Sequence, residues 1–456
     1  MKAELRHISR HAGTVLAGQL AVMAFGTTDT IVASRYSNDA LAALSVGSAI
    51  FVSVYASLMG IFQALLPLWS EQRGAGQPKA IGRSLRQSMY LCALACMLGM
   101  AVLLAPDALL RWTDVPEAVQ HEVKRYLAVL AWGLPPALLF RIYSALNQAL
   151  GHPKLVTWLQ LISLLIKIPL SIWFTFGGLG LEPMGVVGCA LATLLVNYAM
   201  FATALWLVRT QDFYRPLALW VKLERPDWKQ LGYFSRLGVP AGLAILVEVT
   251  SFTLMALYVA RQGSLSSASH QIAANLAAIL YMVPLSLGIA ASARISYWRG
   301  ADDEAQARKL IIQCFKLSVI IGIGLGATLL IARSWIADIY TDSPKVLALT
   351  SWLLISVAAY HVADCVQTYC IFVLRCYRVT VAPLIIYCVL LWGGGLGAGY
   401  WLTYEWQGGP AWQGWQATPM PFWICSAVAL LVTAIAFSSM LFKVIREPEP
   451  SPQSAQ

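Results

Sequence analysis

Twelve long apolar runs, separated by short polar stretches, dominate the pattern of hydrophobic and polar positions along the chain. Each run is about 20 residues or longer, the length that a helix needs to cross a bilayer. Membrane β-strands would instead alternate apolar and polar residues over about 10 positions. The pattern therefore predicts an all-α integral membrane protein with twelve transmembrane helices, near residues 12–34, 40–69, 85–105, 126–150, 155–177, 185–208, 232–260, 269–294, 310–332, 347–374, 380–402 and 421–442.

Two polar stretches interrupt this pattern and divide the chain. Residues 209–230 hold several basic residues among prolines and tryptophans and are predicted to form a cytoplasmic linker. Residues 447–456 read EPEPSPQSAQ, a Pro-rich polar composition that predicts a disordered tail. The rest divides into an N-terminal six-helix bundle, residues 1–208, and a C-terminal six-helix bundle, residues 231–446.

The two predicted bundles repeat one another at an offset of about 226 residues. Arg73-Gly74-Ala75 follows the second run, and Arg299-Gly300-Ala301 follows the eighth. Ala42–Val46 similarly matches Ala268–Ile272. Such matches predict two halves of equal orientation, related by a pseudo-twofold axis along the membrane normal. Parallel repeats of this kind are typical of transporters, with the substrate path between the halves.

The placement of lysine and arginine predicts the orientation of the chain. Basic residues at both ends and after the even-numbered runs, Arg375 and Arg378 among them, outnumber those on the other side by more than two to one. The sequence therefore predicts a multi-pass membrane protein with both termini in the cytoplasm.

Composition agrees with a membrane protein and narrows the partners. Hydrophobic residues make up 58% of the chain and charged residues 12%, whereas soluble domains have about 25% charged residues. The net charge of +10 comes from short loops rather than from a basic domain, so no nucleic-acid partner is expected. The nine cysteines fall mostly within apolar runs and lack metal-ligand spacing, so we expect free thiols and no metal centre.

Four charged side chains are predicted to lie deep in the apolar runs: Asp29, Lys167, Glu248 and Asp364, in the first, fifth, seventh and tenth runs. A charge at the centre of a span costs about 2.5–3.5 kcal/mol on insertion scales and marks function by default. Two have structural alternatives. Asp29 could end a helix near the interface, and Lys167 could snorkel or pair with a buried carboxylate.

Two of these carboxylates share a helical face with an aromatic ring. Glu248 and Phe252 are four residues apart, as are Tyr360 and Asp364. Carboxylates from two helices, with a nearby phenol, could ligate Na⁺ or exchange protons, and the aromatic ring could contact an organic cation. The pattern therefore predicts a cation-coupling and substrate-binding site, against the alternative that both aromatic residues belong to the core.

Other polar side chains in the spans have two interpretations. Gln271 and Asn275 lie one turn apart in the eighth run and could hydrogen-bond between helices or line the substrate path. Asp364 has polar neighbours that could form a structural hydrogen-bond network with it: His361, Gln367 and Thr368.

The order and spacing of short motifs add a family resemblance. They are Asp29-Thr30, Ala42–Ser45, Gly74–Gly76, Gly238–Pro240, Glu248-Val249, His270-Gln271 with Asn275, Pro284–Gly288, and Asp364–Gln367 ending at Leu374-Arg375. With these motifs the chain resembles the multidrug and toxic compound extrusion (MATE) family, NorM-like branch, from about His11 to Phe442.

The resemblance implies a V-shaped pair of six-helix bundles in the bacterial inner membrane, which alternates between outward- and inward-open states as a monomeric antiporter. It further implies a cation site at the positions of Glu248, Asp364, Tyr360 and Phe252, and an acidic site at Asp29 in the N-terminal half.

The sequence departs from the family pattern in its fifth helix. NorM-like proteins usually carry two asparagines four residues apart there, and this chain has Lys167 and Ser171. The lysine could pair with Asp29 and alter or abolish cation use in the N-terminal half.

The function expected from these features is multidrug efflux. We expect antiport, coupled to Na⁺ or H⁺, of small, mostly cationic amphipathic compounds out of the cytoplasm, with membrane lipids as surroundings and no cofactor. A flippase for a lipid-linked precursor would need several deep basic residues, and only Lys167 stands out; a narrow-substrate metabolite exporter is the other alternative. A membrane enzyme would need clustered histidines or carboxylates, whereas the six histidines are scattered.

Overall fold

A computed structural model describes residues 2–107, 110, 117–178, 180–222, 224–406 and 414–446. Twelve helices in this part of the chain are long and apolar enough to cross a membrane. The described residues contain no β-strand, only an isolated bridge between Gly178 and Leu181. The predicted all-α fold with twelve spans is therefore confirmed. The predicted disordered tail, 447–456, lies outside the described residues.

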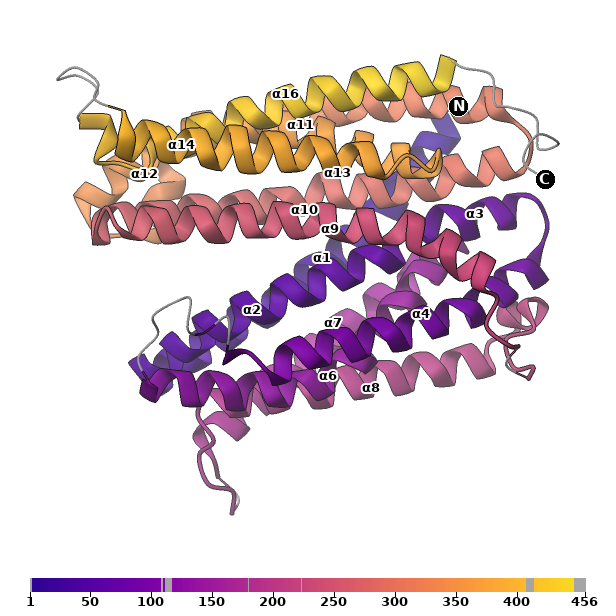
Figure 1. Ribbon diagram of the computed structural model, residues 1–456, viewed down its shortest axis with the longest axis horizontal. Helices are drawn as coiled ribbons and strands as arrows, with labels where there is room; N and C mark the ends of the chain where they lie inside the picture. The colour runs from indigo at the N-terminus through magenta and orange to yellow at the C-terminus, as the bar shows by residue number, and fades with distance from the viewer. Residues whose placement is uncertain are drawn as a thin grey trace. The chain divides into compact units, whose positions relative to one another are not determined.

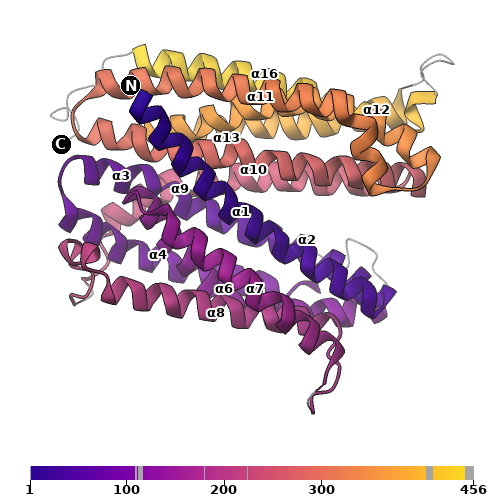
Figure 2. The same ribbon diagram turned by 180° about the vertical axis from the view of Figure 1, so that it is seen from behind.

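Most of the spanning helices extend beyond their apolar runs at one or both ends, and Figures 1 and 2 show the helices from two opposite sides. In the first half they are α1 (Lys2–Tyr36), α2 (Asn38–Gln63), α3 (Leu66–Gly74), α4 (Pro78–Leu104), α6 (Glu117–Ala149), α7 (Pro153–Phe176), α8 (Val186–Thr210) and the 3₁₀ helix η1 (Asp212–Leu217). In the second half they are α9 (Trp228–Ala260), α10 (Ser264–Gly300), α11 (Glu304–Tyr340), α12 (Pro344–Cys376), α13 (Val381–Tyr387), the π-helical η2 (Cys388–Gly397), α14 (Ala398–Tyr400), the π-helical η3 (Trp401–Glu405) and α16 (Met420–Arg446).

The chain folds into two compact units. Gly13–Leu246 forms one, the N-terminal unit; the residues up to Ala12, with those from Val247 onward, form the other, the C-terminal unit. The start of α1 belongs to the C-terminal unit, where Glu4 accepts two hydrogen bonds from Arg294 of α10, each 2.6 Å long. The sequence-based boundaries of the bundles stay a prediction.

α6 is the central helix of the N-terminal unit and packs against α2, α4, α7 and α8. Close packing depends on small residues at the contacts, as is common between membrane helices. Gly47 of α2 is one of them, because a Cβ atom there would lie only 2.6 Å from the ring of Tyr126 on α6. The absence of a side chain at Gly47 thus lets α2 approach α6 closely.

α12 has the same central place in the C-terminal unit, where it packs against α10, α11 and α16. Gly322 and Gly326 of α11, four residues apart, face the backbone of α12 at Val362 and Ala358. Small residues at this spacing let two helical backbones approach closely. In the middle of α12, Tyr360, His361 and Asp364 are buried.

The predicted repeat is visible in the ends of the helices. α2 and α10 begin at Asn38 and Ser264, 226 residues apart. Near the ends of these two spans, in the last turns of α3 and α10, lie Arg73 and Arg299. Arg73 donates a 3.1 Å hydrogen bond to the carbonyl of Ala149 at the end of α6. Arg299 likewise donates to the carbonyl of Cys376 at the end of α12. The two Arg-Gly-Ala motifs therefore have one structural role, which is to cap the C-terminus of the central helix of their unit.

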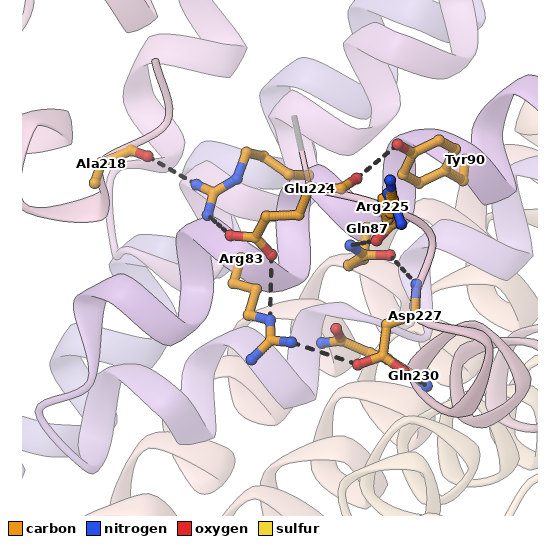
Figure 3. Close-up of polar contacts among 9 residues, drawn as sticks. Arg83, Gln87, Tyr90, Ala218, Glu224, Arg225, Asp227 and Gln230 are labelled. Carbon is orange, nitrogen blue, oxygen red and sulfur yellow. Dashed lines mark hydrogen bonds and ion pairs between the residues drawn. The ribbon is translucent and has the colours of Figure 1, made fainter. Parts of the chain in front are cut away.

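The linker between the halves is fixed to α4 by ion pairs (Figure 3). Arg86 donates to Glu224 over 2.6 Å and to the carbonyl of Ala218 over 2.7 Å. Arg83 lies 3.2 Å from Glu224 and 3.5 Å from Asp227. The hydrogen bond from Arg86, with the charges of both arginines, lowers the pKa of Glu224.

A glutamine side chain adds backbone contacts to this network (Figure 3). The buried amide of Gln87 donates to the carbonyl of Arg225 over 3.0 Å and accepts from the N–H of Asp227 over 2.9 Å. Asp227 in turn accepts from the N–H groups of Lys229 and Gln230 at the start of α9. The linker is thereby held in a defined path that leads directly into α9.

Candidate functional site

Two carboxylates meet in the C-terminal unit. Asp364 of α12 is 2% exposed, and Glu248 of α9 is half-buried and within electrostatic range of it. Asp364 accepts hydrogen bonds from Gln367 over 2.9 Å and from Thr368 over 3.3 Å. The hydroxyl of Tyr387 donates to the side-chain oxygen of Gln367 and thereby orients the amide group of Gln367 toward Asp364. The expected polar network around Asp364 is therefore present with Gln367 and Thr368.

Three aromatic rings lie beside these carboxylates and touch one another edge to face. The ring centroids of Phe252 and Tyr360 are 5.9 Å apart, and both contact Trp423 of α16, at 6.3 Å and 6.0 Å. Phe252 is one turn from Glu248, and Tyr360 is one turn from Asp364. The structure thus brings together four of the predicted site residues. It adds Trp423, which the sequence pattern gave no reason to choose among 17 tryptophans.

Arg375 belongs to the same region, although its position in the sequence placed it among the basic residues outside the spans. It lies in the last turn of α12 and is only 6% exposed. Its guanidinium is within electrostatic range of Glu248. Of the two carboxylates, Glu248 therefore has a buried positive charge near it.

The other polar residues predicted in this half have separate contacts. Asn275 accepts a 3.3 Å hydrogen bond from Tyr340 of α11, as interhelical hydrogen bonding would require, and Gln271 is exposed. His361 contacts the thiol of Cys365 at 3.4 Å. The hydrogen bonds of these described residues do not join them to Glu248 or Asp364.

In the N-terminal unit, the pairing anticipated between Lys167 and Asp29 is confirmed. The ammonium of Lys167 lies 2.9 Å from each carboxylate oxygen of Asp29 and 2.6 Å from the hydroxyl of Thr193. Ser171 donates to Asp29 over 3.2 Å. Lys167 is fully buried and Asp29 is 7% exposed. The pair therefore lies inside its unit rather than at a helix end.

A further buried cation in this unit escaped the sequence analysis. Arg141 of α6 is 6% exposed and donates to the side-chain oxygen of Gln63 on α2. Its position eight residues before the end of α6 was the signal for a buried charge. All nine cysteines are free, as expected, and the described residues hold no cluster of three or more His, Cys, Asp or Glu side chains suited to a metal.

A helical membrane protein with ionisable side chains buried in both of its units has the features of a secondary transporter. The model of the MatE family matches residues 15–173 and 240–400 of the chain. The chain belongs to this family of membrane transporters, and the predicted resemblance is confirmed. MatE transporters are not enzymes and need no cofactor.

The names of relatives with similar sequences agree with this family. The probable multidrug resistance protein NorM of Aromatoleum aromaticum is 35% identical over 96% of this chain and 94% of its own length. The multidrug resistance protein MdtK of Yersinia pseudotuberculosis is 30% identical over 95% of this chain and 94% of its own. A variant of the Vibrio cholerae MATE transporter VcmN has the same fold, with a TM-score of 0.87, 16% identity and 98% coverage of both chains.

Proposed function

We propose that this protein is a multidrug efflux transporter that exchanges small, mostly cationic amphipathic organic compounds for Na⁺ or H⁺. Support comes from its membership in the MatE family and from relatives named multidrug resistance proteins. The observation that carries the proposal is the meeting of Glu248 and Asp364 beside the rings of Phe252, Tyr360 and Trp423.

The carboxylate pair is the proposed coupling site. Two like charges held together in a buried region favour uptake of a cation or a proton, because either one relieves their repulsion. Gln367 and Thr368 donate to one oxygen of Asp364, so its other oxygen stays available. The phenol of Tyr360, one turn away, is the expected further oxygen ligand.

The aromatic rings are the proposed contact for the organic cation. Ring faces attract cations, by about 2 kcal/mol or more where water is excluded. The same carboxylates that bind Na⁺ or H⁺ would attract a cationic substrate, so the two ligands weaken one another's binding. That reciprocal coupling is what thermodynamic linkage requires of an antiporter. Uptake of the coupling ion from outside then releases the drug outward, and inward release of the ion resets the cycle.

The charges of the loops support an orientation of the transporter in the membrane. The excess of lysine and arginine after the even-numbered spans supports a multi-pass protein of the bacterial inner membrane with cytoplasmic termini. We propose that it acts as a monomer, since each chain has a complete carboxylate pair.

Reconstitution tests the proposal directly. Purified protein in liposomes should accumulate a fluorescent organic cation under an opposing H⁺ or Na⁺ gradient, and separate gradients identify the coupling ion. Glu248→Gln and Asp364→Asn should each abolish gradient-driven movement, with Thr328→Ala on the exposed face of α11 as the matched control. Unchanged efflux in both variants would overturn the site assignment. Movement of lipid-linked or anionic probes alone would favour a flippase or a narrow-substrate exporter.

A further inference from the structure

The Asp29–Lys167 pair is built as a filled ion site rather than as a simple salt bridge. A lysine ammonium has three N–H donors. Lys167 directs its ammonium at three oxygen atoms within 2.9 Å: two from Asp29 of α1 and one from Thr193 of α8. The side chain of Lys167 itself is 0% exposed. The ammonium is therefore saturated with oxygen ligands from two other helices.

The surroundings orient these oxygen atoms toward one point. Thr193 donates its own hydroxyl proton to the carbonyl of Cys189 over 2.9 Å, so its lone pairs face the ammonium. Ser171 donates to Asp29 and fixes the carboxylate. The ring of Phe25, with its centroid 5.7 Å from the ammonium nitrogen, closes another side. Three helices, α1, α7 and α8, thus contribute to a cage whose centre is the lysine nitrogen.

We propose that the N-terminal unit contains a monovalent-cation site that is permanently occupied by the tethered ammonium of Lys167. One carboxylate, one hydroxyl and an aromatic face suit a monovalent cation such as Na⁺, K⁺ or an alkylammonium. In this protein the cation is covalently part of α7, so the site cannot exchange its occupant with solution. Asp29 then serves as a fixed counter-charge and carries no coupling ion.

This inference goes beyond the proposed function, because it concerns the unit that lacks the Glu248–Asp364 pair. Of the two buried carboxylate clusters among the described residues, only the one in the C-terminal unit would then exchange a cation. It also predicts that removing the tether exposes a site specific for small cations.

Chemical rescue tests the site. Lys167→Ala removes three carbon atoms and the ammonium, which is the shape of n-propylammonium. The variant is made in a Glu248→Gln/Asp364→Asn background, so that cation effects from the C-terminal unit are removed. Thermal unfolding of the purified protein is followed at constant ionic strength in chloride salts of n-propylammonium, ammonium, Na⁺, K⁺ or N-methylglucamine. n-Propanol is the neutral control for n-propylammonium.

We expect n-propylammonium, and to a lesser degree ammonium or an alkali ion, to raise the unfolding temperature by about 3 °C or more at saturation, because a ligand of the folded state alone stabilises it. N-methylglucamine and propanol should have no such effect. The parent with Lys167 intact should show no cation dependence, and adding Asp29→Asn to Lys167→Ala should abolish it. Lys167→Gln, which keeps more of the packing, serves if the alanine variant does not fold.

Either of two results would overturn the inference. One is an unfolding temperature of the Lys167 variants that is indifferent to all five cations. The other is a cation effect of equal size when Lys167 is present. Because the readout is unfolding rather than transport, a failure of the proposed antiport leaves this test unaffected, and the reverse also holds.

Discussion

The two units present the same scaffold with opposite electrostatic designs. In each unit, the arginine of an Arg-Gly-Ala motif caps the C-terminus of a long central helix, and several other helices pack around that helix. The N-terminal unit neutralises its buried carboxylate with a lysine at 2.9 Å. The C-terminal unit instead has two neighbouring carboxylates, Glu248 and Asp364, and one guanidinium, that of Arg375, within electrostatic range of Glu248. We call the Asp29–Lys167 pair the closed cluster, because its formal charges balance. We call Glu248, Asp364 and Arg375 the open cluster, because it has one more negative charge than positive.

The difference shows that repeat symmetry governs backbone geometry and leaves the chemistry free. At the offset of 226 residues, the equivalents of Glu248 and Asp364 are Val22 and Leu138, and the equivalent of Asp29 is Met255. Helix starts and caps are constrained by packing in both halves, so they remain equivalent. The ionisable residues have no such constraint, and each unit has acquired its own.

The largest effect is expected from breaking the closed cluster. Asp29→Asn leaves the ammonium of Lys167 buried without a counter-charge, and removing one partner of a buried pair costs about 3–5 kcal/mol. Thermal or denaturant unfolding of the detergent-solubilised variant should show this loss. Asp29→Asn combined with Lys167→Met removes both charges and should recover most of the stability. Full stability of the single variant would mean that the pair is not buried as the structure shows.

The open cluster should respond in the opposite way. Asp364→Asn or Glu248→Gln removes one of two repelling carboxylates, so stability should change by less than about 1 kcal/mol. The rate of gradient-driven transport should nevertheless fall by at least tenfold, or about 1.4 kcal/mol in activation free energy. Measuring unfolding and transport on the same preparations separates the two properties. A large loss of stability in these variants would remove the contrast between the units.

A smaller effect is expected from removing the tyrosine hydroxyl that orients Gln367 toward Asp364 in the open cluster. Tyr387→Phe removes the hydroxyl that donates to Gln367, and a typical hydrogen bond contributes about 1 kcal/mol. Without that contact, the amide of Gln367 can rotate away from Asp364. We expect the half-saturating concentration of the coupling ion to change about two- to fivefold, consistent with that free energy, with maximal transport largely retained. Tyr340→Phe, on a hydrogen bond to Asn275, is the matched control and should leave ion dependence unchanged.

The sequence predicted those features of the structure that follow from a single helix or from a pair of opposite charges in the spans. The twelve spans were predictable because each apolar run is long enough to fix its own helix. The Asp29–Lys167 pair was predictable because two opposite charges in apolar spans must find partners. Trp423, Tyr387 and Arg375 could not be assigned to the site, since their roles depend on which helices pack together. Periodicity gives the face of a helix, and it does not give the neighbour of that face.

The smallest effect is expected at the partly exposed ion pairs of the linker, which test whether burial gives the Asp29–Lys167 pair its importance. Glu224 pairs with Arg86 and Arg83 at a site that is partly open to solvent (Figure 3). Because the hydrogen bond from Arg86 lowers the pKa of Glu224, the contact stabilises the folded state above the ordinary carboxyl pKa of about 4.3. That stabilisation disappears as the pH falls through the lower, folded-state pKa. Glu224→Gln should therefore unfold at a slightly lower temperature than the parent at pH 7, and the difference should vanish at acid pH.

Salt completes the comparison between these two kinds of ion pair. The Debye length is about 3 Å in 1 M salt, so exposed charges are screened while buried ones are affected much less. The difference between the parent and Glu224→Gln should shrink in 1 M NaCl at pH 7, whereas the cost of Asp29→Asn should persist. If both differences shrank together, solvent would reach Lys167, and the description of its ammonium as a permanently enclosed cation would be wrong. If neither shrank, the linker contact would owe its effect to the hydrogen-bond geometry of Arg86 rather than to charge.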